Sequence, residues 1–414
     1  MSPSLDTTPR RRRFVGSREQ SQTGDRSTVI VRAKKNVSRL INQIPQEILD
    51  DVELKEAVRL LPSNYNFEIF KTVWNVRKNN AKRVCLQMPE GLLIYSMVIA
   101  DIIEQFCQAE VLVMGDVSYG ACCIDDYTAR ALDCDMIVHY AHSCLVPIDV
   151  TKIKVLYVFV TIAIDEKHLM RTLTKNFDHG MRLAVFGTIQ FNPTIHSIKN
   201  ELEGPDSEKL LYIIPPQISP LSKGEVLGCT SASLDPNQYD AMVYIGDGRF
   251  HLESAMIHNP SIPAFRYDPY SRKFTREYYA QEEMVQVRTD AVQRARDAKK
   301  IGLILGALGR QGNPVTVEKL EQQLIQAGKI VVKIILSEIF PAKLAMFDDI
   351  DAFVQVACPR LSIDWGYAFH KPLLTPYEAM VMLENDKKFE TGFYPMDYYA
   401  KDGYGRGKVP DRNA

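Results

Sequence analysis

Short apolar runs that follow a basic residue recur three times along the chain. Each run predicts a buried strand, and a turn and then a helical pattern follow it. The three runs are RVCLQM (Arg83 to Met88), RLAVFG (Arg182 to Gly187) and KIGLIL (Lys300 to Leu305). A second apolar strand is predicted to begin at nearly the same distance from each, near Glu110, Leu210 and Lys329.

A third predicted strand follows in each unit, and an aspartate stands just before its apolar run. These aspartates are Asp135, Asp240 and Asp351. Equal spacing in three units indicates an internal repeat. Alternating strands and helices indicate βαβ units with a parallel sheet. We therefore predict an α/β protein with three similar parallel-sheet α/β domains around a pseudo-threefold axis, preceded by a helical N-terminal segment.

The predicted boundaries follow from the repeat and from its flanks. Helical patterns near 45–61 and 67–79 lead into the first domain. Residues 1–40 include the basic run 10–13 and few apolar positions, which is typical of a disordered tail, and we expect residues 391–414 to form a flexible tail. The domains are expected at 41–175 with the helical segment, at 176–290 and at 291–390.

Composition limits the function more than the fold. Apolar residues make up 46% and charged residues 24% of the chain, as in ordinary soluble domains. The net charge is −1, which favours neither nucleic acid nor membrane binding. The first residues lack the apolar core of a signal peptide. We therefore expect a cytoplasmic protein whose eight cysteines are reduced thiols with roles in burial, catalysis or metal binding.

Three cysteines occupy related positions at strand ends. Cys122 lies in VLVMGDVSYGACCIDD after the second strand of the first unit, Cys229 in VLGCTSAS of the second unit, and Cys358 in VACPRLSIDWG of the third. If the units pack around one axis, each offers a thiolate to the centre. Thiolates suit an iron–sulfur cluster or zinc, and three protein ligands leave a coordination position open.

A single cysteine is more often a core residue than a ligand. We expect Cys85, Cys107, Cys134 and Cys144 to be structural. Cys123 adjoins Cys122 and is expected to point away from it, although the doubled cysteine leaves open which thiol binds.

The segments SYGACCIDD, VLGCTSAS and VACPRLSIDWG together resemble the diphthamide synthase family. The resemblance runs from about residue 45 to residue 390. The segments GDGRFHLE (246–253) and LGRQGNP (308–314) belong to the same resemblance. It implies one ligand of a [4Fe–4S] cluster in each of three domains, at Cys122, Cys229 and Cys358. An accessory paralogue in this family lacks the middle cysteine. This chain keeps it as Cys229, which indicates a catalytic subunit.

The resemblance implies an unusual radical use of S-adenosylmethionine. In the family, the reduced cluster passes one electron to the sulfonium, and the bond from sulfur to the methionine Cγ breaks. The resulting 3-amino-3-carboxypropyl radical adds to C2 of a histidine of translation elongation factor 2, the first step of diphthamide biosynthesis. The implied partners are the paralogous subunit 2 in a heterodimer, elongation factor 2 as protein substrate, and a small iron-binding electron donor protein.

Binding of S-adenosylmethionine would require side chains that contact its carboxylate. Its carboxylate favours a planar, bidentate cation, which arginine supplies, and a histidine could serve the substrate side. Each such residue could instead form a surface or interdomain ion pair, or in the case of histidine a structural contact. The candidates are Arg360, Arg249, Arg310, Gln311, His251 and His142. Asp125 and Asp126 are expected to cap a helix.

Other interpretations stay open at this point. A quinolinate-synthase-like dehydratase also has three α/β units with one cluster cysteine each, and its open iron acts as a Lewis acid. The local motifs GACC, GCTS and ACPRLSIDWG match the diphthamide pattern better. A non-catalytic, cluster-bearing subunit of a heterodimer and a zinc-only site are further alternatives.

Overall fold

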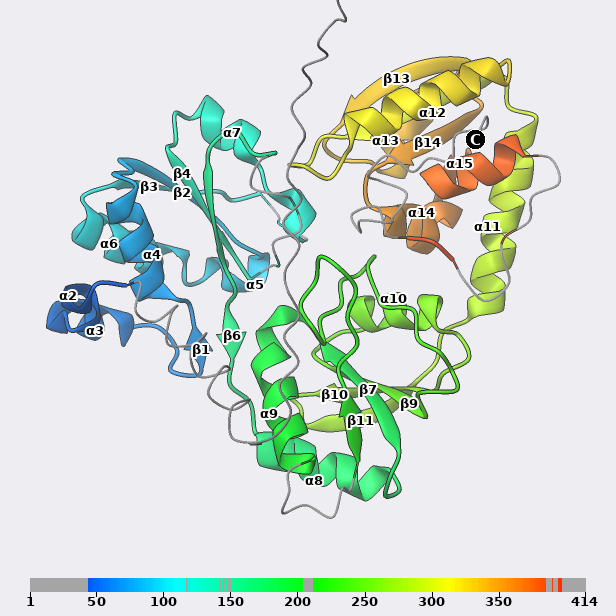
Figure 1. Cartoon of the computed structure of the whole chain (residues 1–414). Coiled ribbons are helices and arrows are strands. Elements are labelled where there is room, and N and C mark those ends of the chain that lie inside the picture. The colour runs from blue at the N-terminus through cyan, green and yellow to red at the C-terminus, as the bar shows by residue number, and fades with distance from the viewer. Residues whose placement is uncertain are drawn as a thin grey trace, which may run out of the picture. The chain divides into compact units, whose positions relative to one another are not determined.

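The computed structural model describes residues 44–116, 118, 120–141, 143, 146, 150–203, 211–384, 389 and 394–396. The larger of its two compact units spans Glu47–Ala414 and contains three main β-sheets (Figure 1). The predicted disordered tail at 1–40, the candidate His142 and the expected structural cysteine Cys144 lie outside the described residues.

The first sheet follows three helices that match the predicted helical segment, α2 (Gln46–Leu49), α3 (Val52–Val58) and α4 (Ile69–Lys78). All four of its strands are parallel, in the order β3-β2-β4-β5. The strands are β2 (Arg83–Gln87), β3 (Glu110–Val113), β4 (Met136–Tyr140) and β5 (Lys154–Val158). The helices of this domain are α5 (Glu90–Leu93), α6 (Ser96–Cys107), the 3-10 turn η1 (Ala121–Cys123) and α7 (Asp126–Ala131).

The second sheet has five strands in the order β11-β10-β9-β7-β8, and only β11 is antiparallel to its neighbour. A short antiparallel pair precedes it, β1 (Tyr65–Asn66) with β6 (Thr161–Ile162). The sheet strands are β7 (Arg182–Gly187), β8 (Tyr212–Ile214), β9 (Ala241–Ile245), β10 (Ala264–Asp268) and β11 (Lys273–Glu277). Its helices are α8 (Glu166–Asn176), η2 (Ile189–Phe191), α9 (Asn192–Leu202) and α10 (Phe250–His258).

The third sheet is again parallel throughout, in the order β13-β12-β14-β15. Its strands are β12 (Lys300–Gly306), β13 (Ile330–Leu336), β14 (Ala352–Val356) and β15 (Leu373–Leu374). The helices are α11 (Gln281–Arg296), which leads in from the second domain, α12 (Pro314–Gln326), α13 (Pro341–Ala345), α14 (Pro359–Trp365), η3 (Gly366–Ala368) and α15 (Pro376–Leu383).

One strand order is common to the three sheets. In each, the first strand lies between the second and the third, and the fourth lies beside the third. The prediction of three similar parallel-sheet α/β domains is therefore confirmed, and β2, β7 and β12 begin where the basic residues predicted them. In such sheets the strand order reverses between the neighbouring first and third strands, and ligands bind at the carboxyl ends of the strands at that point.

The aspartate before each third strand joins that strand to the first one. The Asp135 carboxylate accepts hydrogen bonds from the backbone N–H groups of Lys82 (2.7 Å) and Arg83 (2.9 Å). Asp351 accepts from Lys299 (2.9 Å) and Lys300 (2.8 Å) in the same way. In the second domain, Asp240 accepts from the backbone N–H and the guanidinium of Arg182. The repeated aspartate is thus a structural device.

The C-terminal segment differs from the expectation at two described residues. Tyr394 and Met396 are 1% and 0% exposed and belong to the core cluster of the third domain. The Tyr394 hydroxyl donates to the buried carboxylate of Glu378 on α15. Residues 391–414 were expected to form a flexible tail, but at these positions the chain is packed because an aromatic and an apolar side chain complete a core.

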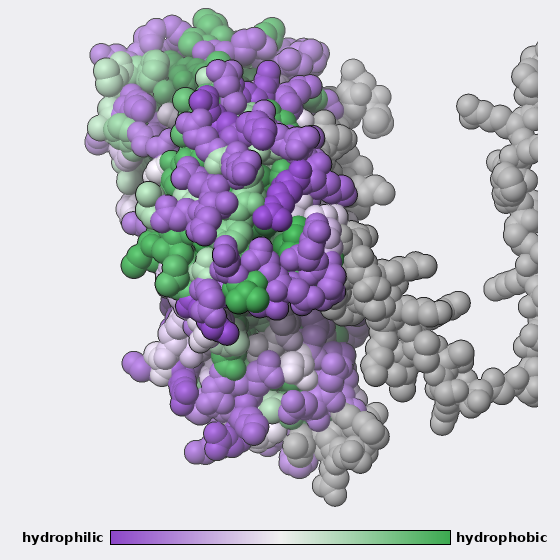
Figure 2. Space-filling model, turned by 90° about the vertical axis from the view of Figure 1, so that its left-hand side faces the viewer, coloured by the Kyte–Doolittle hydropathy of each residue, from purple (hydrophilic) through white to green (hydrophobic). Residues whose placement is uncertain are grey.

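The surface carries separate apolar patches in a mainly hydrophilic face (Figure 2). Exposed apolar side chains of the first domain include Val52, Leu60, Ile94 and Met97. Scattered residues of this kind are normal on folded domains. No helix in the described part of the chain has the length and hydrophobicity that crossing a membrane requires.

We predict that Asp351→Ala loosens the start of β12. Backbone N–H hydrogen bonds hold the pKa of the Asp351 carboxyl below its usual value of 3.8, so the carboxylate stabilises the fold above that pH. That contribution disappears as the pH falls through the lower, folded-state pKa. Amide hydrogen exchange of peptides covering β12 should be faster in the variant at neutral pH, and the difference should shrink in acid.

The matched control is Asp348→Ala, a change of an exposed aspartate on the same connection. Equal exchange in both variants would contradict the assigned role of Asp351.

Candidate metal centre

The three predicted ligands follow strands of three different sheets. Cys122 lies in η1 after β3, Cys229 lies in the connection from β8 to β9, and Cys358 is the N-cap residue of α14 directly after β14. All three side chains are partly buried.

The electrostatic surroundings of Cys122 include the thiols of the other two domains. Hydrogen bonding to Cys123 and burial raise the pKa of the Cys122 thiol, and the charges of Cys229 and Cys358 raise it further. Three thiolates in this space would repel one another without a compensating cation. A metal cluster would supply that charge and hold its ligands deprotonated, and thiolates are the donor type that iron–sulfur clusters take. Within the described residues, no group of three or more His, Cys, Asp or Glu side chains is placed to hold a metal ion.

Cys123 lies beside this group. Its Sγ is 4.0 Å from the Sγ of Cys122, and its side chain is 1% exposed. Gln87 on β2 donates from Nε2 to the Cys123 carbonyl (2.9 Å), and this hydrogen bond joins η1 to the first strand of the sheet. Burial raises the pKa of the Cys358 thiol, and the charge of Cys123 adds a smaller contribution in the same direction. That Cys122, and not Cys123, binds metal stays a prediction.

The neighbouring domains supply the apolar surroundings of the first two thiols. Cys122 packs against the buried Leu221 of the second domain, which Ile218 and Leu227 also contact. Cys229 packs against the core cluster of the third domain. Apolar surroundings control solvent access and the local dielectric at a metal centre.

Gly309 of the LGRQGNP turn lies directly on the Cys122–Cys123 segment. Its φ is +54°, and a Cβ added there would lie 2.3 Å from the Cys123 carbonyl oxygen. Only glycine accommodates both the backbone conformation and the close approach. The turn after β12 is therefore fitted against the ligand turn of the first domain.

Arg310, the next residue, forms an ion pair with the first domain. It donates to both carboxylate oxygens of Asp126 (2.6 and 2.7 Å) and to the Tyr127 hydroxyl (2.7 Å). Asp126 is fully buried and also accepts from the Lys152 N–H (2.9 Å). Asp125 is the N-cap of α7, as predicted. The capping role expected for Asp126 is wrong, because both its oxygens are used between domains.

Arg360 is 2% exposed, and protein groups surround its guanidinium. It bonds the carboxylates of Asp364 (2.9 Å) and Glu253 (2.6 Å). Nη1 donates to the carbonyls of Gly228 (3.1 Å) and Phe250 (2.7 Å). Arg360 thus has the interdomain ion pair that was the alternative to a contact with S-adenosylmethionine.

The other basic candidate also has protein partners. Arg249 donates to the Tyr278 carbonyl (2.7 Å) and pairs with Glu277 (3.2 Å), with its side chain 46% exposed. Gln311 lies in the same turn as Arg310, and its backbone N–H donates to the Leu308 carbonyl (3.2 Å). A role for these residues in binding S-adenosylmethionine stays a prediction.

His251 lines a cavity of about 370 Å³ at the carboxyl ends of β2, β4, β7 and β9. Its ring stacks on Tyr244, with centroids 6.5 Å apart. The described lining residues include no arginine or lysine; they are Tyr65, Pro89, Gly91, Leu92, Ala141, Val160, Ile162, Thr188, Gln190, Phe191, Asp247, Gly248, Phe250, His251 and Tyr270.

Two lining residues give this cavity a contact with the Cys229 loop and a hydrogen-bond acceptor. The Phe250 ring fills the space beside Gly228, where an added Cβ would lie 1.9 Å from a ring carbon, so the cavity wall touches the residue before Cys229. Gln190 donates from Nε2 to the Ala141 carbonyl (2.9 Å), while its buried Oε1 has no hydrogen-bond partner among the described residues. Buried acceptors are nearly always paired, so this oxygen is available to a ligand donor.

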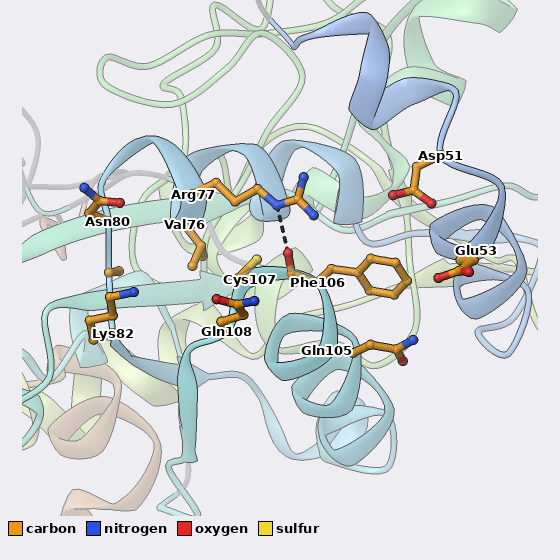
Figure 3. Close-up of a pocket in the computed structure, with 11 residues that line it drawn as sticks. Asp51, Glu53, Val76, Arg77, Asn80, Lys82, Gln105, Phe106, Cys107 and Gln108 are labelled. Carbon is orange, nitrogen blue, oxygen red and sulfur yellow. Dashed lines mark hydrogen bonds between the residues drawn. The ribbon is translucent and has the colours of Figure 1, made fainter.

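A second cavity, of about 480 Å³, lies in the first domain and is lined by none of the three ligand cysteines. Figure 3 shows its polar lining, in which Arg77 donates to the Phe106 carbonyl (2.8 Å). Cys107 lies here, with its Sγ 3.8 Å from the Val73 carbonyl. Burial raises the pKa of the Cys107 thiol to about 11. The contact of this thiol with a carbonyl of its own domain agrees with the structural role expected for it.

Residues 88–395 match a protein family described as "Putative diphthamide synthesis protein". The chain belongs to this family. The match covers all three domains and all three candidate ligands, and the resemblance stated from the sequence is confirmed.

Relatives within the diphthamide synthesis family are similar over nearly their whole length. A protein of Debaryomyces hansenii is 73% identical over 405 residues, which cover 97% of this chain and 96% of the relative. One of Saccharomyces cerevisiae is 68% identical over 410 residues, with coverage of 97% and 96%. Both relatives are named 2-(3-amino-3-carboxypropyl)histidine synthase subunit 1.

Solved structures of Dph2 from Pyrococcus horikoshii share the fold. One matches with a TM-score of 0.65 and 25% identity, covering 80% of this chain and 94% of that one. A second, of Dph2 with a 4Fe-4S cluster, matches with the same score and identity over 81% and 94%.

We predict that Arg310→Gln loosens α7 and the Cys122 turn. The change leaves the Asp126 carboxylate buried without its main cation, and breaking a buried pair in this way costs about 3–5 kcal/mol. Hydrogen exchange should rise in peptides spanning η1 and α7.

The control is Arg130→Gln, which removes an exposed cation from α7 itself. An Arg310→Gln variant with the exchange pattern of this control would show that the ion pair holds nothing in place.

Proposed function

We propose that this chain is the catalytic, cluster-bearing subunit of a 2-(3-amino-3-carboxypropyl)histidine synthase. It would transfer the 3-amino-3-carboxypropyl group of S-adenosylmethionine to a histidine of translation elongation factor 2, the first step of diphthamide biosynthesis. The observation that carries the proposal is the match of residues 88–395, which include Cys122, Cys229 and Cys358, to the diphthamide synthesis family, together with the fold shared with Dph2, which has a structure with a 4Fe-4S cluster.

Cys122, Cys229 and Cys358 would hold the cluster, leaving one iron without a protein ligand. A bound and reduced cluster would supply one electron to the sulfonium of S-adenosylmethionine. The contribution of the chain is to orient the cosubstrate so that the bond from sulfur to Cγ breaks, and not a bond to the ribose or the methyl group. Selecting among three carbon–sulfur bonds is a matter of positioning more than of acid–base catalysis.

We assign the cosubstrate to the cavity lined by His251. The aromatic rings of Phe191, Phe250 and Tyr270 line it together with the polar side chains of Thr188 and Gln190. Aromatic faces suit an adenine, and the unpartnered Gln190 Oε1 suits an amine donor. Phe250 brings the cavity wall against the residue before Cys229.

Three further partners belong to the proposal. The relatives are named as subunit 1, which supports a complex with a paralogous subunit 2. A single-electron step requires a donor, for which a small iron-binding protein is the candidate. Elongation factor 2 supplies the acceptor imidazole.

The test of the function uses the chain purified with its paralogue without oxygen. The complex is reduced and given S-adenosylmethionine with elongation factor 2. We expect methylthioadenosine to be released and the target histidine to gain the mass of the aminocarboxypropyl group. A protein with an intact cluster that yields neither product would overturn the proposal in favour of a dehydratase or a non-catalytic subunit.

We predict that Cys229→Ala abolishes both cluster binding and transfer, because only two of three ligands remain. Iron and sulfide analysis with the visible absorption of the cluster checks the first effect, and mass spectrometry of the target the second. Cys107→Ala is the control, since that thiol lies in the separate cavity of the first domain. Full activity in Cys229→Ala would remove the middle ligand from the proposal.

We predict that His251→Ala weakens binding of S-adenosylmethionine without loss of iron. The variant removes a ring from the cavity lining and from the stack on Tyr244. We expect KM for S-adenosylmethionine to rise about tenfold or more, as when an aromatic contact to a ligand is lost. An unchanged KM would place the cosubstrate elsewhere.

A further inference from the structure

We propose that Arg360 is a positioning residue that fixes the spacing of the Cys229 and Cys358 ligands. This inference rests on the proposed function, because it assumes that these cysteines bind one cluster. It assigns to Arg360 a role different from the cosubstrate contact expected from the sequence.

The side chain of Arg360 reaches the ligand loop of another domain. It extends from the first turn of α14, whose N-cap is Cys358, to the Gly228 carbonyl at 3.1 Å. Gly228 C=O and Cys229 N–H belong to one planar peptide unit. Holding that carbonyl therefore sets the direction in which the chain enters Cys229. One guanidinium thus constrains two ligand positions that are far apart in sequence.

The guanidinium of Arg360 is held rigidly because all three of its nitrogens donate hydrogen bonds to protein groups. Asp364 on its own helix and Glu253 on α10 take charge-assisted hydrogen bonds at 2.9 and 2.6 Å. The Cζ atom of Arg360 lies 4.4 Å from the centre of the Phe250 ring. A planar fork with fixed donors can serve this arrangement, whereas an ammonium group cannot reach all the partners at once. Burial is tolerated because two carboxylates compensate the charge.

The same contacts extend to the cavity wall. Nη1 of Arg360 also donates to the Phe250 carbonyl at 2.7 Å, and the Phe250 ring both lies against Gly228 and lines the cavity. A shift of the guanidinium would therefore move the cavity wall together with the Cys229 loop. The position of the cosubstrate relative to the cluster depends on this one side chain.

The experiment compares Arg360→Lys with the unaltered chain, each in complex with the paralogous subunit and loaded with iron and sulfide without oxygen. The readouts are cluster content, the electron paramagnetic resonance spectrum of the reduced cluster, and the rate of iron loss to a chelator. Substitutions in the groups that orient metal ligands typically weaken metal binding 10–100-fold. We expect iron loss about tenfold faster or more and a changed spectrum in the variant.

Arg288→Lys is the matched control for general destabilisation. Arg288 is 1% exposed and pairs bidentately with Glu378 (2.6 and 2.7 Å), but both residues lie within the third domain. We expect this variant to unfold at a lower temperature while its cluster spectrum stays unchanged. If Arg360→Lys and Arg288→Lys alter the spectrum equally, the effect of Arg360 is explained by a general loss of fold stability, and the proposal is overturned.

Glu253→Gln covers the case in which Arg360→Lys does not fold. It keeps an acceptor oxygen for Arg360 but removes one compensating charge, so we expect a smaller change of the same kind. Unchanged spectra and iron-loss rates in both Arg360→Lys and Glu253→Gln would overturn the inference. If the unaltered chain itself takes up no cluster, the proposed function fails instead.

Discussion

The proposed cluster site requires that three thiols from three separate domains meet in a space that no single domain encloses. Each ligand follows a strand of a parallel sheet, so each sheet delivers its thiol at the same type of edge. Hydrogen bonding to Cys123 and burial raise the pKa of the Cys122 thiol, and the charges of Cys229 and Cys358 raise it further, so the protein alone does not favour three thiolates together. Contacts between the domains hold the candidate ligand loops in place.

Two arginines of the third domain make those contacts. Arg310 pairs with Asp126 beside the Cys122 turn, and Arg360 reaches the carbonyl before Cys229. Both guanidinium groups are largely buried and bonded to carboxylates, so removing one partner leaves a buried charge without compensation. The ion pairs therefore specify one arrangement of the domains more than they add stability to each domain.

The repeat made much of the fold predictable. Basic residues at 83, 182 and 300 marked the first strands, and Asp135, Asp240 and Asp351 marked the third, because each carboxylate binds backbone N–H groups of the first strand. The contacts of Asp126 with Arg310, and of Arg360 with Glu253 and the Gly228 carbonyl, were not predictable, since these partners lie in other domains and no local pattern encodes such contacts. The burial of Tyr394 was not predicted because its hydrogen-bond partner is Glu378, and a charged residue is normally expected at the surface and not in a core.

The placement of the ligands in three domains also governs when the centre can be assembled during the life of the protein. Cys358 follows the third strand of the last domain, so a ribosome has completed most of the chain before the third ligand emerges. If the three cysteines bind one cluster as proposed, cluster insertion follows synthesis, and a folded protein with three reduced thiols precedes the loaded one. Such an intermediate is open to oxidation at its partly buried sulfurs, so delivery of iron and sulfide competes with oxygen for the same atoms.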